Sequence, residues 1–445
     1  MSIVDQGVKV RALIEKALAQ HEAGRLDAAE ATYKEALSVL PDNVAAKLNL
    51  GVLTAALGKH GLAIEYFNSI ILTQPNYEMA YFNRAVSLIA LGKTVEAIAN
   101  LNYVCKLDPS HYKAHRALGF LHLSHSRRGE AMDHWAQTYE LRRGDIRTGI
   151  GNHSLNKSSR GKLLHDAEQF RFLASVSRER QKFELLALGY EAAAKEASND
   201  IFSVSDALAD SLGEDYNKAI NIRSAPEIPG GAVQARSDYD QIMRSFHLDQ
   251  KGIAWFDDLL TPKALMALQR YLLESTIWHD FSHIGGFVAS YLEDGLACPL
   301  VLQIADELRH VFPDILGPHP LCQAWAFKGI DGNAAIEAHV DDADVSVNFW
   351  ITPNDGNLDS TTGGLEICRE PPPASWAIKD YNLDKSRAHS YLEQRADSNI
   401  IIPYCENRAV IFDSHIPHRS HRPQFINDYK YHRINITLLF GRHNK

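Results

Sequence analysis

Four residues in the last third of the chain have the types and the order of a metal site with an anion-binding partner. His339 and Asp341 are two positions apart, His418 follows an apolar run, and Arg433 comes fifteen residues later. Side chains two positions apart on an extended segment point the same way, so one strand end can offer His339 and Asp341 together. Two imidazoles and one carboxylate on one face of a metal leave other positions open. Non-haem Fe(II) sites use this ligand set for oxidative chemistry.

Other residues compete for these roles. A second His-any-Asp triplet lies at His247 and Asp249, but it precedes a helical region and no alternating strand follows it directly. For each candidate, the alternative interpretation is an ordinary surface residue that belongs to no site. The remaining competitors are His415 and His421 for the distal histidine, and Arg422 and Arg442 for the arginine.

Short strands must position these side chains. Two helices are expected first, over 261–275, with Thr261 as N-cap and Pro262 in the first turn, and over 299–311. Many short strands between Gly, Pro and Asn turns then indicate an antiparallel sandwich or barrel. The predicted strands are 322–328, 345–351, 364–368, 399–402, 409–412 and 434–440.

Taken together, these motifs resemble the Fe(II)/2-oxoglutarate-dependent dioxygenase superfamily and, within it, the prolyl-hydroxylase-like branch. The motifs are His339-Val340-Asp341, a Gly363-Gly364-Leu365 turn and strand, His418, and the run that Arg433 opens. The resemblance covers residues 236–445 and implies a double-stranded β-helix (jelly-roll) with flanking helices. Bacterial proteins that join tetratricopeptide repeats to such a domain are similar to the whole arrangement.

The resemblance implies a role for each site residue. His339, Asp341 and His418 would hold Fe(II), and Arg433 would anchor the far carboxylate of 2-oxoglutarate, because a guanidinium can bind a carboxylate bidentately. Alternation places Asn435 on the same strand face as Arg433, although the family usually has Ser or Thr there. Asn348, Trp325 and Lys328 are further candidates for lining the co-substrate pocket.

The implied reaction is a hydroxylation. 2-Oxoglutarate and O2 would be consumed, succinate and CO2 released, and one oxygen atom inserted into a C–H bond of the substrate. Halogenating relatives lack the carboxylate ligand, so the presence of Asp341 favours hydroxylation.

The first 143 residues repeat with a period of 34. This period, with small residues at the helix crossing and bulky ones beside them, resembles the tetratricopeptide repeat, an antiparallel helix pair. Stacked pairs form a solenoid with a concave groove, which is expected to bind a protein or peptide. Asn49, Asn83 and Arg84 are plausible contributors to that groove. The residues in phase are Pro41, Pro75 and Pro109; Ala29, Ala63, Ala97 and Ala131; and Tyr33, Phe67, Leu101 and Trp135.

The middle of the chain connects these parts. Residues 144–162 are rich in Gly, Ser, Asn and Arg and are expected to be a linker, whereas 162–197 has helical spacing. The predicted domains are therefore 1–143, a linker and helical capping region over 144–235, and 236–445. The long segment 371–396 between strands is a candidate lid over the active site.

Composition narrows the function. The chain has 445 residues and a net charge of −9, without a basic stripe, so nucleic acid is not an expected partner. No apolar run approaches the ~18 residues of a membrane span, and the first residues lack the pattern of a secretion signal. The five scattered cysteines are expected to be reduced thiols of a cytoplasmic protein.

These inferences lead to one main hypothesis. The chain is expected to be a hydroxylase that acts on a protein or peptide recruited by the tetratricopeptide groove. The alternatives are an oxygenase for a small molecule or carrier-bound metabolite, and a non-catalytic interaction scaffold. The target residue, the pathway and the oligomeric state are not encoded in any motif.

Overall fold

The structure is a computed structural model in two compact units, Met1–Leu121 and His122–Lys445. Residues 145–156 of the predicted linker, the Arg442 alternative and part of the candidate lid (371, 374–375 and 377–384) lie outside the described residues. Those residues are 3–144, 157–213, 215–249, 252–282, 286–370, 372–373, 376 and 385–441.

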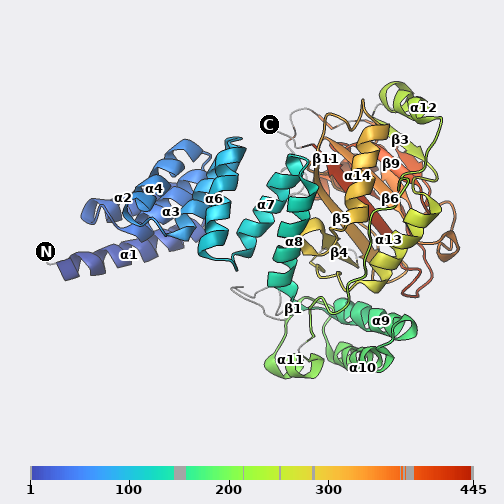
Figure 1. Ribbon diagram of the computed structural model, residues 1–445, viewed down its shortest axis with the longest axis horizontal. Helices are drawn as coiled ribbons and strands as arrows, with labels where there is room; N and C mark the ends of the chain where they lie inside the picture. The colour runs from blue at the N-terminus through green and yellow to red at the C-terminus, as the bar shows by residue number, and fades with distance from the viewer. Residues whose placement is uncertain are drawn as a thin grey trace. The chain divides into compact units, whose positions relative to one another are not determined.

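The first unit is a stack of antiparallel helix pairs (Figure 1). The third, fifth and seventh helices begin 34 residues apart, and so do the fourth, sixth and eighth, which confirms the predicted period. The eighth helix, α8 (Arg128–Arg143), belongs to the second unit, and the unit boundary falls within α7. The others are α1 (Ile3–Glu22), α2 (Leu26–Val39), α3 (Val44–Ala56), α4 (His60–Thr73), α5 (Glu78–Ala90), α6 (Thr94–Leu107) and α7 (Tyr112–Ser124).

The small and bulky residues of the repeat pack as the pattern predicts. Ala63 and Phe67 are fully buried in the second repeat, as are Ala97 and Leu101 in the third. A Cβ at position 51 would lie 2.6 Å from the Phe67 ring, so only glycine lets α3 approach α4 this closely.

The turns within the helix pairs share one left-handed residue. Gly24, Gly58 and Gly92 have φ of +71°, +76° and +71°, and Ser126 takes the same place in the fourth turn with φ +59°. A side chain in this conformation costs roughly 1–2 kcal/mol, which glycine avoids. Ser126 is therefore the one strained member of the four.

We expect Ser126→Gly to raise the free energy of unfolding by about 0.5–1 kcal/mol, because the relieved strain exceeds the added flexibility of the unfolded chain. Urea unfolding followed by circular dichroism measures the difference. Gly92→Ser makes the reverse change one repeat earlier and should destabilise the protein. Shifts of the same sign in both variants would contradict this explanation.

In the second unit, several helices precede the strands or lie between them in the chain. The predicted helical region 162–197 forms α9 (Arg160–Val176) and α10 (Arg180–Glu196), which bury Phe170 and Phe183 against each other. Helix α13 (Pro262–Glu274) has the predicted cap, because the Thr261 hydroxyl accepts a hydrogen bond from the Ala264 N–H. Helix α14 (Pro299–Val311) has the predicted bounds, and α11 (Asp206–Leu212), α12 (Tyr239–Arg244) and α16 (Lys385–Glu393) are shorter.

Two antiparallel sheets form the C-terminal region. The larger has the order β3-β9-β6-β11-β5-β4 and the smaller β10-β7-β8. All six predicted strands are present; β3, β4 and β10 were not predicted. The bounds are β3 (Ile253–Phe256), β4 (Phe287–Tyr291), β5 (Leu321–Gly329), β6 (Val345–Trp350), β7 (Leu365–Ile367), β8 (Ile400–Ile402), β9 (Ala409–Asp413), β10 (His418–Ser420) and β11 (Ile434–Phe440).

The two sheets pack face to face. Trp350 and Phe412 from the larger sheet share one buried cluster with Leu365 and Ile367 from the smaller. Alternation along each strand then decides which polar side chains enter the space between the sheets. On β6, this inner face carries Ser346 and Asn348 together with Trp350, and these residues form the surroundings of the site.

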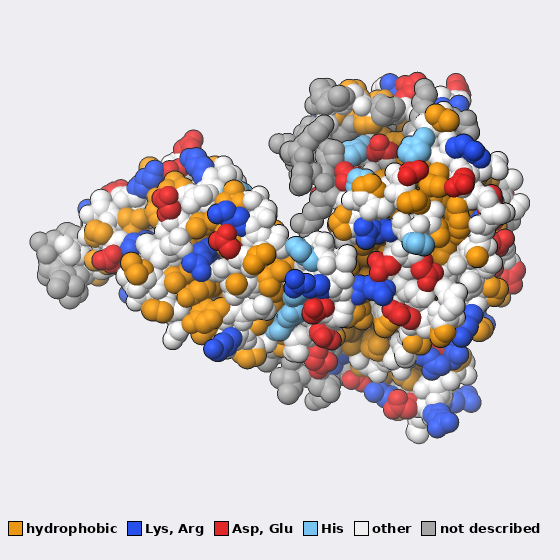
Figure 2. Space-filling model, turned by 45° about the horizontal axis from the view of Figure 1, so that its top comes forward, with side chains coloured by type: hydrophobic (Ala, Val, Ile, Leu, Met, Phe, Trp, Pro, Cys, Tyr) orange, Lys and Arg blue, Asp and Glu red, His pale blue; other side chains and the backbone are white. Residues whose placement is uncertain are grey.

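In Figure 2, acidic, basic and apolar side chains are interspersed over both units on the face in view. No helix within the described residues has the length and apolar character needed to cross a membrane.

Candidate metal centre

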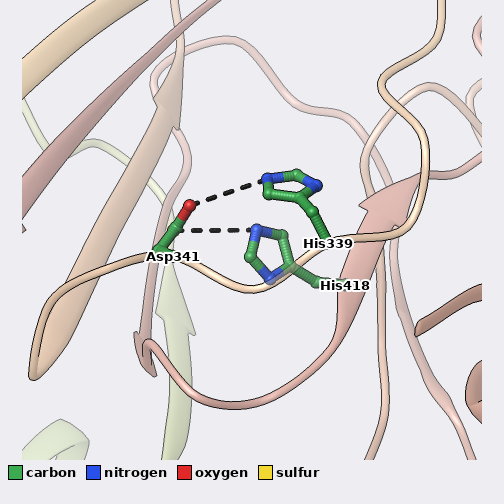
Figure 3. Close-up of side chains that lie close together, drawn as sticks. All are labelled: His339, Asp341 and His418. Carbon is green, nitrogen blue, oxygen red and sulfur yellow. Dashed lines mark ion pairs between the residues drawn. The ribbon is translucent and has the colours of Figure 1, made fainter. Parts of the chain in front are cut away.

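His339, Asp341 and His418 come together where the segment before β6 lies beside β10 (Figure 3). The backbone N–H of His339 donates to the backbone carbonyl of His418 at 3.1 Å, and the backbone N–H of His418 donates to the His339 carbonyl at 3.0 Å. Asp341 Oδ1 lies 3.6 Å from His339 Nε2, and Oδ2 lies 3.7 Å from His418 Nε2. One ligand atom from each residue falls within 4.8 Å of the others, a spacing that one metal ion can bridge.

Backbone carbonyls orient both imidazoles. His339 Nδ1 lies 2.8 Å from the Glu337 carbonyl, and His418 Nδ1 lies 3.0 Å from the Ile416 carbonyl. A carbonyl only accepts, so each Nδ1 carries the proton and each Nε2 presents a lone pair toward Asp341. This is the tautomer that a metal ligand needs.

Asp341 and His418 are the two buried ligands. Asp341 is 3% exposed, and its Oδ2 accepts a hydrogen bond of 2.6 Å from Ser346, whose hydroxyl lies 2.8 Å from that of Ser414. Burial, and secondarily the neighbouring His339, lowers the pKa of His418 to about 4, so this imidazole is neutral at physiological pH. The side chain of His339 is 27% exposed, so the site opens on that side.

Two nitrogens and one carboxylate oxygen fit a divalent transition metal. Such a set leaves three positions of an octahedral ion open, as non-haem Fe(II) requires, and it would also accept zinc with fewer added ligands. Within the described residues, no second group of three His, Cys, Asp or Glu side chains comes this close.

The competing residues lie elsewhere. His415 pairs through Nδ1 with Asp413 at 2.8 Å, and His421 lines a different hollow. His247 is on the short π-helix η1 (Ser245–Asp249), outside the three-residue group. Arg422 is exposed, with φ +42°. The structure therefore brings together the three residues first proposed as ligands.

Arg433 is buried at the start of β11. Its Nε donates to the Gly363 carbonyl at 2.7 Å and its Nη1 to Asn435 Oδ1 at 3.2 Å, whereas its Nη2 has no hydrogen-bond partner. Burial lowers its pKa to about 10, which still leaves it cationic at neutral pH. A buried cation with an unused donor is ready to receive an anion.

Two more polar atoms on this inner face lack partners. Asn348 uses its amide nitrogen on Thr437 at 2.8 Å and leaves Oδ1 unpaired, and Trp350 Nε1 is also unpaired. Rotating the Asn348 amide would let the Thr437 hydroxyl donate to Oδ1 and would free both N–H groups. A buried polar atom without a partner costs about 1–3 kcal/mol, so a bound anion that satisfied these donors would stabilise the arrangement.

Two further candidates for the co-substrate pocket separate by strand register. Trp325 is the partner of Thr437 and shares its face. Lys328 is the partner of Ile434 and lies on the opposite face, where its Nζ is fully buried 2.9 Å from the Tyr429 ring centroid. The suggestion that Lys328 lines this pocket is therefore wrong, because β5 turns that side chain away from the space between the sheets.

Two residues near the site were not identified from the sequence: Ser346 and Ser414, whose hydroxyls form the hydrogen-bond chain that ends on Asp341. Ser346 lies two residues before Asn348 on β6, so alternation alone would have placed it on the same face. Ser414 gave no such signal, because it follows the end of β9.

We expect Ser346→Ala to weaken divalent-metal binding by about 10- to 100-fold, because Asp341 loses the hydrogen bond that fixes its orientation. Titration of the metal-free protein with Co(II), read by visible absorption, gives the affinity. Ser290→Ala removes a buried hydroxyl that bonds to the Asp294 carbonyl instead, and it should leave Co(II) affinity unchanged. Equal losses in the two variants would indicate a general packing effect.

Comparisons with known proteins bear on the N-terminal region. The tetratricopeptide repeat family matches residues 11–78. No curated protein sequence matches the chain. MamA from Desulfovibrio magneticus RS-1 is 20% identical over 30% of this chain and 75% of its own, with a TM-score of 0.28. MamA AMB-1 is 27% identical over 30% and 72%, with a TM-score of 0.27.

A further similar structure is the first tetratricopeptide domain of Spaghetti (RPAP3) bound to an HSP90 peptide. It is 24% identical over 26% of this chain and 94% of its own, with a TM-score of 0.26. The family match and the 34-residue helix pairs together identify the N-terminal region as a tetratricopeptide repeat solenoid.

Proposed function

We propose that the C-terminal region is an Fe(II)- and 2-oxoglutarate-dependent dioxygenase that hydroxylates a side chain of a protein or peptide. The main observation behind this proposal is the group formed by His339, Asp341 and His418, whose ligand atoms lie within 4.8 Å of one another. Arg433, a buried cation with an unused donor, supports a dicarboxylate co-substrate. The paired antiparallel sheets are compatible with the jelly-roll that this function implies.

The residues of the chain would divide the work. His339 and His418 offer neutral nitrogens and Asp341 a carboxylate, while Arg433 would hold the far carboxylate of 2-oxoglutarate. When bound, Fe(II) would supply the oxidative chemistry that converts 2-oxoglutarate, O2 and a C–H group to succinate, CO2 and an alcohol. The inner apolar side chains, among them Phe412 against His418 at 4.6 Å between ring centroids, keep bulk water away.

The tetratricopeptide repeats support a partner-binding role, because stacked helix pairs of this class present an extended surface to polypeptides. We propose that the bound partner is the substrate. In the first unit, Arg84 bonds to Asn68 and Asn100, so it is already engaged within the repeats. Asn83 donates to the Met79 carbonyl of its own helix.

The test is anaerobic titration of the metal-free protein with Fe(II) and 2-oxoglutarate, followed by the visible charge-transfer band of the chelate. The wild type should develop the band, and Asp341→Ala and His418→Ala should lose it. His415→Ala, a histidine outside the group, is the matched control and should retain it. A folded, metal-binding wild type without a band would refute the proposal.

The substrate is then sought with the intact chain. Partners captured by the protein are incubated with Fe(II), 2-oxoglutarate and air, and their peptides are weighed by mass spectrometry. A gain of one oxygen that requires 2-oxoglutarate and is lost with Asp341→Ala would identify the target. Capture without any such gain would leave the repeats as a scaffold.

A further inference from the structure

A cleft of about 450 Å³ opens beside the candidate metal centre. One wall is the segment that carries the ligands His339 and Asp341. A second part of the lining, the aromatic wall, comes from two neighbouring strands, with Phe287 and Tyr291 on β4 and Trp325 and Phe327 on β5. Whatever enters this cleft therefore meets both the ligand segment and the aromatic rings.

Strand register explains the aromatic wall. Tyr291 is the partner of Trp325, and Trp325 in turn is the partner of Thr437, so all three share the inner face of the large sheet. Trp325 lies 5.9 Å from Phe327 and 6.3 Å from Tyr291 between ring centroids. Contacts among the rings fix their positions before a ligand arrives, which lowers the entropy cost of binding.

The charge of the cleft is one-sided. Glu337, Asp341 and Asp342 line it, and no lysine or arginine does so among the described residues. Asp341 would be neutralised by a metal, but Glu337 and Asp342 are exposed carboxylates at the mouth. Gln323, which also lines the cleft, donates a hydrogen bond of 3.2 Å to Glu293.

A neighbouring hollow carries charges of both signs. It measures about 850 Å³ and shares only the 336–338 segment with the aromatic cleft. Its lining includes Arg419, Arg422, His389 and His421 as well as Glu366 and Glu393. The absence of lysine and arginine is therefore particular to the cleft beside the ligands.

We propose that this aromatic cleft binds a cationic side chain, lysyl or arginyl, and presents it to the metal centre. Aromatic faces attract cations through their quadrupoles, and the attraction strengthens where water is excluded. The carboxylates at the mouth add long-range attraction. The inference deepens the proposed function by naming the class of substrate residue, and only its catalytic half depends on that function. A neutral occupant, such as a prolyl or aliphatic side chain, is the competing outcome.

The binding test uses the full chain labelled with 5-fluorotryptophan and observed by fluorine NMR without 2-oxoglutarate. Trp325→Phe assigns the Trp325 resonance. The probes are the N-acetyl methylamides of lysine, norleucine and proline; the first two differ by the terminal amine. We expect the lysine probe to shift the Trp325 resonance with about tenfold higher affinity than either neutral probe.

Variants that remove the acidic charges at the mouth of the cleft test whether those charges cause the preference for lysine. Glu337→Gln combined with Asp342→Asn should reduce lysine binding toward the norleucine level, whereas Asp355→Asn, an exposed acid outside the cleft, should not. Norleucine or proline binding as tight as lysine, or no Trp325 shift with millimolar lysine probe, would overturn the inference.

The two proposals fail separately. A charge-transfer band without preference for the cation would remove the cationic substrate and leave the oxygenase. Selective binding of the lysine probe by a protein that forms no band would leave the cation site and remove the oxygenase.

Discussion

Arg433→Gln is expected to raise the 2-oxoglutarate concentration for half-maximal charge-transfer absorbance by about 30- to 1000-fold, with little change in Fe(II) affinity. Arg433 is 5% exposed and has an unused donor on the inner face. Removing one partner from a buried charged pair costs about 2–4 kcal/mol, which corresponds to that range. Glutamine stays polar but loses both the charge and the reach of the guanidinium, so the variant tests the whole guanidinium.

Two controls make this result specific. Arg422→Gln changes an exposed arginine and should leave the titration unchanged. 2-Oxobutanoate, which lacks the far carboxylate, should bind equally well to wild type and Arg433→Gln, because it has nothing for Arg433 to hold. If 2-oxobutanoate is affected as strongly as 2-oxoglutarate, Arg433 acts on folding or on the metal and not on the carboxylate.

Elements with a long internal pattern could be predicted from the sequence. The 34-residue period indicated the helix pairs because small, bulky and turn residues recur in phase, and β11 was predicted with its observed bounds because its side chains alternate from Ile434 to Leu438 before the apolar end of the run. The cap of α13 was local as well, since Thr261 and Pro262 are adjacent. In each case the determining interactions lie within one repeat or one strand.

Elements defined by distant partners could not be predicted. Strand β10 has three residues and exists because it pairs with β7, more than fifty positions earlier. Lys328 shows a different limit: alternation already places it on the opposite face from Trp325 and Phe327, and only the packing of Tyr429 shows that the lysine is buried there. The ligand roles of His339, Asp341 and His418 stay predictions, although the fold brings the three side chains together.

The buried ion pair between α8 and the short 3-10 helix η2 (Leu292–Asp294) carries the second large prediction. Arg143 donates to Asp294 through Nε at 3.1 Å and Nη2 at 3.0 Å, and Arg142 adds a contact of 3.0 Å. Both residues of the bidentate pair are almost fully buried. Asp294→Asn should therefore lower the free energy of unfolding by about 3–5 kcal/mol, because it leaves a buried guanidinium without its counter-charge. Urea unfolding at neutral pH measures this loss.

The same pair predicts a pH dependence. Burial alone would raise the pKa of Asp294, but Arg143 and then Arg142 outweigh it and hold this pKa well below the usual value. A carboxylate with a lowered folded-state pKa stabilises the protein fully above its unfolded pKa of about 3.9, and this contribution is lost as the pH falls below that value. The wild type should lose this stability below about pH 4, and Asp294→Asn should show a flatter curve there.

An exposed pair of the same geometry is the control. Arg171 and Glu191 join α9 to α10 by two hydrogen bonds of 2.8 and 2.9 Å at the surface. Water screens that pair, so Glu191→Gln should cost less than about 1 kcal/mol. Arg143→Met combined with Asp294→Leu removes both buried charges and should recover much of the stability that Asp294→Asn loses. If the double variant is as unstable as Asp294→Asn, shape and not the unpaired charge determines the loss, and the electrostatic explanation fails.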